Sequence, residues 1–301
     1  MTSFATPAKL YESVLITGGA GMLAAALKQA LAERQINVAA PPRAELDILN
    51  EASVRAAFNA IKPTLVLNCA AYTKVDLAEK ETAAANAING TAVGSLAKLC
   101  KEFGAALVHY STDYVFDGSL SRPLKPGDPV GPQSAYGRSK LLGETELQAN
   151  APDRWLILRT AWLYGCGGPC FPATMVNAAR AGKPLKVVVD QVGSPTYTVD
   201  LAAATLDLLD RGGQGIYHVA NAGQTNWRDF TVAILDEFGT PKEVGSLTSA
   251  DWKAMRPESA TRPSYSVFDL APLEQKLGRS MPTWRDALAR YRAAVDAAGS
   301  F

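Results

Sequence analysis

Tyr136 and Lys140 are the residues of this 301-residue chain whose type and spacing point most directly to chemistry. Side chains four positions apart lie one turn from each other on the same face of a helix. An ammonium beside a phenol favours the phenolate and lowers the phenol's pKa from its usual value of about 10. We therefore expect Tyr136 to act as a general acid for a developing alkoxide, with Lys140 lowering its pKa.

Thr112 lies upstream, where the apolar run AALVHY, which predicts a strand, comes to its end. Its hydroxyl could bind the same substrate oxygen as Tyr136, so Thr112, Tyr136 and Lys140 are the candidate catalytic residues. A simpler interpretation stays open, in which Tyr136 and Lys140 form a solvated pair on a helix and Thr112 caps a turn. The elements around these residues must decide between the two.

A glycine-rich turn near the N-terminus predicts a dinucleotide site. Residues 13–17 (SVLIT) read as a buried strand, Gly18-Gly-Ala-Gly21 follows, and an Ala/Leu-rich helix extends from Met22 to Gln35. Such a turn lets the backbone approach a pyrophosphate, and the helix N-terminus offers free N–H groups and a positive dipole end. A tight structural turn is the alternative, but it leaves the clustering of glycines unexplained.

The loop after the expected second strand, residues 37–40, indicates which dinucleotide is bound. In an NAD-specific site an acidic residue near the end of this strand holds the ribose 2′-hydroxyl. Here no acid precedes Glu45 and Asp47, and Arg43 could meet a 2′-phosphate instead. The sequence therefore favours NADPH, with NADH as a second cofactor that the site could accept. Asp47 could also cap the helix expected over 51–60.

Strands and helices alternate through the first 160 residues, which is the pattern of a doubly wound parallel sheet. The expected strands are 13–17, 37–40, 64–68, 105–110 and 154–159, and the expected helices include 22–35, 51–60, 78–87 and 90–103. Small residues after the third strand (Cys69-Ala70-Ala71) would let a cofactor lie close. We expect an α/β fold with a Rossmann sheet whose ligands bind outside the carboxyl ends of the strands.

The sequence pattern changes after about residue 165, where Gly/Pro-rich loops separate shorter helices and strands. We expect residues 1–165 to form the dinucleotide-binding domain, with the Tyr136–Lys140 helix in it and residues 1–12 as a short extension. Residues 166–301 would form mainly a smaller C-terminal substrate-binding lobe, with segments that return to the sheet.

Composition excludes several other classes of protein. The formal net charge of +1 provides no basic field for nucleic acid, and no apolar run approaches the roughly 18 residues of a membrane span. We see no signal peptide and expect a cytoplasmic protein. The chain has four cysteines and only His109 and His218 as histidines, so we expect neither a metal site nor a Cys166–Cys170 disulfide.

The chain resembles the extended short-chain dehydrogenase/reductases and, among them, the dTDP-4-dehydrorhamnose reductase family. The resemblance extends from residue 16 to about residue 290, nearly the whole chain. The HYSTDYVFDG and DQVGSPT blocks distinguish this subgroup from most sugar-nucleotide epimerases. The motifs are GGAGMLA, RAELDI, NCAAYTKVDLAE, HYSTDYVFDG, AYGRSKLLGE, LRTAWLYG, VVVDQVGSPTYTVDLA, GIYHVANAGQTNWRDF and TRPSYSVFDL.

The resemblance implies roles for particular residues. The cofactor diphosphate would be held by Gly18, Gly21, Met22 and Leu23, and the adenine would lie by Asp47 and Ile48. The rest of the cofactor would be lined by Ala70, Ala71, Tyr72, Thr73 and Tyr110, while Lys140 would also bond the nicotinamide ribose. The sugar substrate would contact Thr112, Asp113 and Trp162, although Trp162 could equally be a core residue. Asn89 resembles the family's structural or proton-relay asparagine.

The implied activity is reduction, by NADPH or NADH, of the C4 ketone of dTDP-4-dehydro-L-rhamnose to give dTDP-L-rhamnose. The segments GMLAAAL and CGGPC depart from the family pattern, and CGGPC borders the expected substrate mouth. Two alternatives stay open: another nucleotide-sugar 4-ketoreductase or epimerase, and a non-catalytic regulatory subunit like that of methionine adenosyltransferase. We expect a small nucleotide-sugar substrate and a monomer or homodimer.

Overall fold

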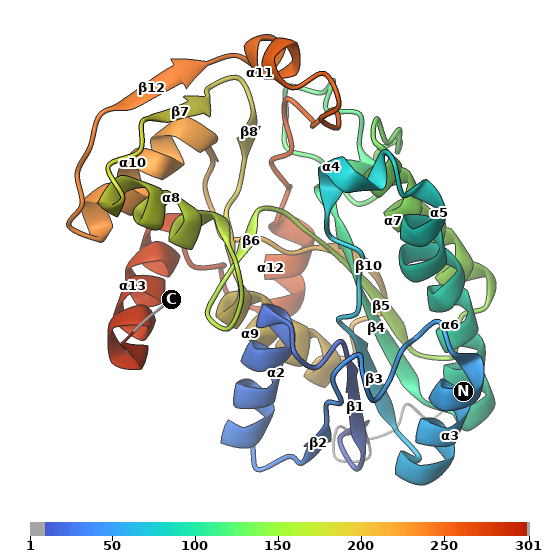
Figure 1. The fold of residues 1–301 in the computed structure, drawn as a ribbon. Coiled ribbons are helices and arrows are strands. Elements are labelled where there is room, and N and C mark those ends of the chain that lie inside the picture. The colour runs from blue at the N-terminus through green and yellow to red at the C-terminus, as the bar shows by residue number, and fades with distance from the viewer. Residues whose placement is uncertain (1–9, 300–301) are drawn as a thin grey trace.

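A six-stranded parallel sheet forms the centre of the computed structural model, which describes residues 10–299 (Figure 1). Most of the predicted extension, residues 1–9, lies outside the described residues. The strand order is β10-β5-β4-β3-β1-β2, so the order reverses between β1 and β3, which is where open α/β sheets bind their ligands. The strands are β1 (Val14–Thr17), β2 (Val38–Ala39), β3 (Leu65–Asn68), β4 (Ala106–Thr112), β5 (Trp155–Thr160) and β10 (Gly215–His218).

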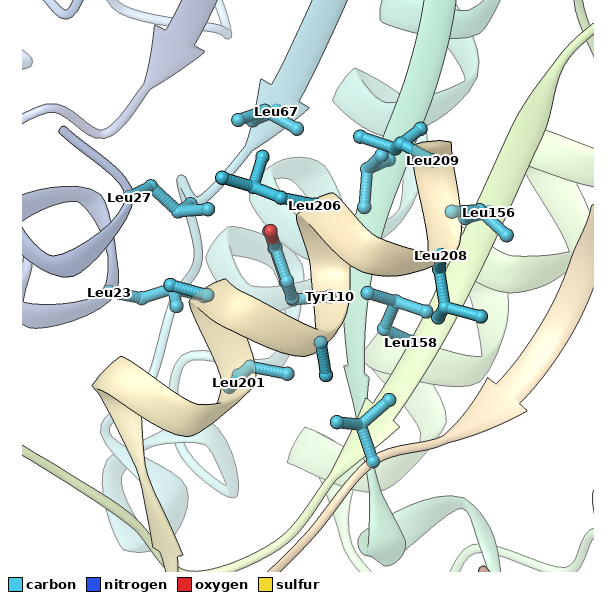
Figure 2. Close-up of a cluster of buried hydrophobic side chains, with 14 of the residues drawn as sticks. Leu23, Leu27, Leu67, Tyr110, Leu156, Leu158, Leu201, Leu206, Leu208 and Leu209 are labelled. Carbon is cyan, nitrogen blue, oxygen red and sulfur yellow. The ribbon is translucent and has the colours of Figure 1, made fainter. Parts of the chain in front are cut away.

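Helices cover both faces of this sheet, which confirms the predicted doubly wound α/β class. One face carries α2 (Met22–Glu33), α9 (Thr198–Asp210) and α12 (Ala271–Leu277), and the other carries α3 (Glu51–Ile61), α6 (Ala92–Phe103) and α7 (Ala135–Ala149). Figure 2 shows leucines of α2 and α9 packed around Tyr110 of β4. The strands are apolar on both sides because each side faces a helix layer.

A smaller lobe stands over the carboxyl edge of the sheet (Figure 1). It contains α8 (Phe171–Arg180), α10 (Trp227–Glu237), α11 (Ser249–Met255), α13 (Trp284–Ala298) and the parallel pair β7 (Leu185–Val188) with β12 (Val244–Leu247). Its core is aromatic, with Tyr164, Phe230, Trp284 and Tyr291 buried together. Between lobe segments the chain returns to the sheet as α9, β10 and α12.

Short strand pairs join the lobe to the sheet, and the sequence did not predict them. They are β6 (Leu163–Tyr164) with β9 (Thr196–Tyr197), and β8 (Val192–Gly193) with β11 (Thr225–Asn226). Two-residue strands carry too little pattern to be read from a sequence.

The helices before β4 differ from the prediction. Instead of helices over 78–87 and 90–103, α4 (Val75–Ala78) is followed by α5 (Thr82–Asn86), a π-helical turn η1 (Ala87–Thr91) and α6 without a break. Gly90 lies within this continuous segment, and an added Cβ there would lie 2.4 Å from the side chain of Leu142 in α7. It is a close-packing residue between two helices. No helix within residues 10–299 is long and apolar enough to span a membrane.

Candidate active site

A cleft of about 730 Å³ opens at the carboxyl ends of β1, β3, β4 and β5, below the lobe. It collects residues that lie far apart in the sequence, from the glycine loop to the segment after β5. All of the predicted site residues except Tyr72 and Asn89 line it: Gly18, Gly21, Met22, Leu23, Arg43, Asp47, Ile48, Ala70, Ala71, Thr73, Tyr110, Thr112, Asp113, Tyr136, Lys140 and Trp162.

The glycine loop has no space for side chains. Gly18 has a φ of +67°, and a Cβ there would lie 2.8 Å from the Ala70 backbone. A Cβ on Gly19 would lie 2.0 Å from the Ala40 carbonyl oxygen. Gly21 caps α2 with no side-chain hydrogen bond, so the first-turn N–H groups of α2 stay available at the cleft. Free amides at a helix N-terminus beside small residues fit a pyrophosphate.

Arg43 and Asp47 form an exposed ion pair at the far end of the cleft, with Nη2 3.1 Å from Oδ2. Such pairs contribute about 0–1 kcal/mol, so an incoming phosphate can compete for the guanidinium. Asp47 does not cap α3: that position belongs to Asn50, whose side chain accepts from the Ser53 N–H.

Thr112 is the last residue of β4 and caps the following 3-10 turn η2 (Asp113–Val115). Its Oγ1 accepts from the Tyr114 N–H at 3.2 Å and donates to Asp113 Oδ1 at 2.9 Å. The capping role predicted as an alternative is therefore present, and the same hydroxyl also lines the cleft. Strand β4 runs two residues further than predicted because Ser111 and Thr112 pair with Arg159 and Thr160 of β5.

Tyr136 lies in the first turn of α7, which begins where Ser134 caps the helix by accepting from the Gly137 N–H. Burial raises the pKa of Tyr136 to about 12, with the Thr112 hydroxyl acting in the opposite direction. We predicted that Lys140 lowers this pKa, but in this structure the pKa is raised by burial and by the charge of Asp113, and the group that lowers it is Thr112. At neutral pH the phenol therefore carries its proton, which is the state a general acid needs.

Lys140 is 2% exposed, so it is not part of a solvated pair on a helix surface. Its Nζ donates to the Tyr110 carbonyl at 2.5 Å and lies 3.3 Å from Nε2 of His109. Burial lowers the pKa of Lys140 to about 8, and the nearby Glu144 acts to raise it. The ammonium is thus held by β4 rather than by solvent.

Asp113 is a buried carboxyl that faces the same cleft. Burial raises its pKa to about 6, while hydrogen bonds from Ser266 and Thr112 act to lower it. A carboxylate of this kind can accept hydrogen bonds from the hydroxyls of a bound sugar.

Trp162 follows β5 with a φ of +49°, in the left-handed region that side chains rarely adopt. Its indole stacks on Trp227 of α10, with ring centroids 3.6 Å apart and planes 8° apart. Trp162 also lines the cleft, so it is both a packing residue and a wall of the site. The stack fixes this wall to the lobe.

Tyr72 and Asn89 lie behind the cleft. Tyr72 does not line it, and its phenol donates to Glu81 at 2.7 Å. Asn89, in the π-helical turn, accepts from the Tyr72 N–H and donates to the Tyr72 carbonyl and to Ser139 of α7. Asn89 therefore ties the loop after β3 to the helix that carries Tyr136.

Sequence reasoning did not single out Thr160, the last residue of β5. Thr160 is one of the residues that line the cleft, and among the described residues its buried hydroxyl has no hydrogen-bond partner. Its position at the end of a strand, as the register partner of Thr112, is the pattern by which it could have been found.

The unusual CGGPC segment also borders the cleft, through Gly167, Gly168, Pro169 and Cys170. A Cβ on Gly168 would lie 2.8 Å from Met22 of α2. All four cysteines are free, and Cys170 Sγ lies 3.3 Å from the Tyr291 hydroxyl. Within residues 10–299 no three His, Cys, Asp or Glu side chains are grouped as metal ligands.

A parallel sheet with a glycine loop at its switch point, and with Thr, Tyr and Lys at the carboxyl ends, is the scaffold of a dinucleotide-binding dehydrogenase/reductase. The model of the RmlD substrate binding domain matches residues 12–296. The chain therefore belongs to the RmlD substrate binding domain family.

Individual relatives agree with this assignment. The chain is 41% identical to a dTDP-4-dehydrorhamnose reductase of Streptomyces griseus, over 91% of either chain. It is 40% identical to the spore coat polysaccharide biosynthesis protein SpsK of Bacillus subtilis (strain 168), over 92% of this chain and 96% of that protein. A crystal structure of dTDP-4-dehydrorhamnose reductase from Bacillus anthracis in complex with NADP has a TM-score of 0.88 and 34% identity, covering 93% of this chain and 98% of that one.

Proposed function

We propose that this protein is an NADPH-dependent reductase that converts the C4 ketone of dTDP-4-dehydro-L-rhamnose to the alcohol of dTDP-L-rhamnose. The observation that carries this function is the convergence of Thr112, Tyr136 and Lys140 with the glycine loop in one cleft. Relatives about 40% identical over nearly the whole chain are named as this reductase.

The cofactor end of the cleft extends from the glycine loop to Arg43. Gly18, Gly21 and the first-turn amides of α2 hold the diphosphate, and Ile48 and Asp47 lie beside the adenine. Arg43 is the cation in reach of a 2′-phosphate, and its pair with Asp47 is weak enough to be exchanged. When bound, the dinucleotide supplies the hydride for the ketone carbon.

The other end of the cleft binds the sugar and donates the proton. Tyr136 donates the phenolic proton to the oxygen of the ketone as negative charge develops there. Thr112 donates a hydrogen bond to the same oxygen once its hydroxyl proton turns away from Asp113 Oδ1, and Lys140 supplies positive charge beside the site. Asp113, in the turn after β4, and Trp162, in the segment after β5, hold the sugar.

The test is an absorbance assay at the nicotinamide band with dTDP-4-dehydro-L-rhamnose, in which NADPH and NADH are compared. We expect oxidation of NADPH with formation of dTDP-L-rhamnose, and slower turnover with NADH. An Arg43→Ala variant should lose the preference for NADPH while it keeps turnover with NADH.

Other outcomes would support the alternative functions. Tightly retained NAD in the purified protein, without net cofactor consumption, would indicate an epimerase. Turnover of a different dTDP-4-keto sugar would keep the reaction and change the substrate. Absence of turnover with any such sugar, together with tight binding to a partner enzyme, would indicate a regulatory subunit.

A further inference from the structure

A row of buried polar side chains crosses the sheet beneath the cleft and ends at Lys140. Thr17, Asn68 and His109 are register partners on the adjacent strands β1, β3 and β4, and each is at most 1% exposed. Thr17 Oγ1 donates to Asn68 Oδ1 at 2.6 Å, and Asn68 Nδ2 lies 3.1 Å from His109 Nδ1. His109 Nε2 lies 3.3 Å from Lys140 Nζ. None of the roles described above uses the first three residues of this row.

The hydrogen bonds in this row have a direction. The Asn68 amide nitrogen can only donate, so Nδ1 of His109 must accept and the single proton of a neutral ring stands on Nε2. Nε2–H then points at Lys140 Nζ. An ammonium has no lone pair to accept this proton, whereas a neutral amine has one. This direction therefore fits Lys140 in its neutral form.

Rotating the side-chain amide of Asn68 by half a turn reverses the direction of the hydrogen bonds in the row. The side-chain oxygen of Asn68 then accepts from Nδ1–H of His109, and its nitrogen donates to Thr17 Oγ1, a hydroxyl that can serve either way. Nε2 of His109 becomes an acceptor, which fits the Lys140 ammonium. In either direction Thr17, Asn68 and His109 stay hydrogen-bonded to one another, but in the reversed row the Thr17 hydroxyl, which also accepts from the Ala70 N–H at 3.4 Å, no longer donates to Asn68. The charge of Lys140 is the other difference between the two arrangements.

We propose that His109 is a positioning residue for Lys140, and that the Thr17–Asn68–His109 row couples the ring tautomer of His109 to the charge of Lys140. When Lys140 is an ammonium, the ring is the Nδ1–H tautomer. When Lys140 has released one proton to solvent, the ring still carries one proton, now on Nε2. The coupling itself does not depend on the proposed function. The proposed function is needed only for its consequence for activity, which is the pH range over which Lys140 stays an ammonium.

Burial and local charge make this coupling possible. Burial and the Lys140 charge hold the pKa of His109 well below its usual range, so the ring stays neutral while Lys140 titrates. Lys140 Nζ keeps its contact with the Tyr110 carbonyl on the other side.

The other titratable and charged groups around Lys140 come from several elements. Tyr136 and Glu144 are on its own helix, Asp113 follows β4, Cys69 follows β3, and Arg159 of β5 is paired with Glu144. Glu144 is held in its pair with Arg159, whereas the Thr17–Asn68–His109 row can reverse its hydrogen bonds, so the row is the adjustable contact of Lys140.

Nitrogen-15 NMR of the ligand-free protein tests the coupling directly. The sequence contains two histidines, and His218 serves as an internal reference because its Nδ1 lies 2.9 Å from the Leu124 carbonyl, which can only accept. We expect His218 to remain Nδ1–H from pH 6 to pH 10. His109 should change from Nδ1–H to Nε2–H near pH 8 without becoming charged. A His109 tautomer that does not change over this range would overturn the proposal.

Two variants provide the controls. In Lys140→Met the tautomer of His109 should no longer depend on pH, and a change that persists would contradict the coupling.

In Asn68→Asp the carboxylate only accepts, so His109 should remain Nδ1–H at every pH. The alkaline limb of the kcat/KM profile should then move upward by about one pH unit. If neither variant folds, the wild-type titration decides alone. Failure of the proposed function would appear separately, as no NADPH oxidation with an unchanged NMR titration.

Discussion

Burial controls the titration of the side chains that face the cleft. It raises the pKa of Asp113 to about 6 and that of Tyr136 to about 12, and it lowers the pKa of Lys140 to about 8. Each group is shifted toward its neutral form, as expected where water is excluded. Tyr136 therefore keeps its proton near neutral pH, while Asp113 and Lys140 are the groups whose charge changes with pH in this range.

Removing the phenolic hydroxyl should abolish proton delivery with little change to the site. We expect Tyr136→Phe to lose at least about 10²-fold in kcat, the usual scale for a positioned general acid, while NADPH still binds. Single-turnover kinetics and fluorescence titration of NADPH separate the two effects. Turnover like that of the wild type would exclude Tyr136 as the acid.

Asp113 should give the sugar-binding step a pH dependence. Below a pH of about 6 its carboxyl is protonated and no longer accepts hydrogen bonds as a carboxylate, so kcat/KM for the sugar should fall as the pH is lowered. Asp113→Asn should show a lower plateau without this inflection. An inflection that persists near pH 6 in the variant would assign it to another group.

The same carboxyl should reduce the stability of the fold at neutral pH. Its pKa is raised from 3.8 to about 6 by folding, so the folded state binds this proton more tightly than the unfolded chain. Its contribution to stability is therefore full below about pH 4 and is lost as the pH rises through about 6, by roughly 3 kcal/mol. Asp113→Asn should be more stable than the wild type at pH 7.5 and equal to it near pH 4, as measured by urea unfolding.

At the scale of elements, helix α7 presents Tyr136, Lys140 and Glu144 along one face, four residues apart. Glu144 is 1% exposed; its Oε2 lies 2.7 Å from Arg159 Nη2, and its Oε1 accepts from Ser111 Oγ at 2.5 Å. The pair joins α7 to β4 and β5 directly behind Lys140. The ion pair fixes the position of α7 relative to β4 and β5.

Breaking this pair should destabilise the protein strongly. Glu144→Gln leaves the Arg159 guanidinium buried without its counter-charge, which typically costs about 3–5 kcal/mol. The double variant Glu144→Leu/Arg159→Met should recover most of this loss, because it removes both charges. Urea unfolding measures the difference, and a loss below about 1 kcal/mol in Glu144→Gln would show that solvent reaches the pair.

At the scale of the whole molecule, the stack of Trp162 on Trp227 joins the sheet to the lobe. Trp162 follows β5 and Trp227 begins α10, so the wall of the cleft that we propose for the sugar depends on how the lobe is placed. Trp227 itself does not line the cleft. It can be changed without removing a group that faces the substrate.

Trp227→Leu should therefore raise KM for the sugar by about 2- to 10-fold, the range expected from losing an aromatic pair of about 0.5–1.5 kcal/mol, with the Kd for NADPH unchanged. Trp252→Leu, in α11 and outside the cleft, is the matched control. Equal effects of the two substitutions on KM would indicate general destabilisation of the lobe.

The sequence alone determined the α/β class, the place of the glycine loop and the helix that carries Tyr136 and Lys140. These features follow from local patterns: apolar runs of strand length, glycines between a strand and a helix, and a four-residue spacing. The strand ends indicated the edge of the sheet where the site lies. The resemblance to a known family implied most of the individual residues, and sixteen of the predicted residues line the cleft.

Only the tertiary structure decided the rest, because burial and contact between distant segments have no local pattern. It showed that the pKa of Tyr136 is raised, that the Tyr72 phenol donates to Glu81, and that the buried hydroxyl of Thr160 has no hydrogen-bond partner among the described residues. It also placed Thr17, Asn68 and His109, from three separate strands, in one row that ends at Lys140. The chemistry of a buried group depends on these neighbours, and the fold alone brings them together.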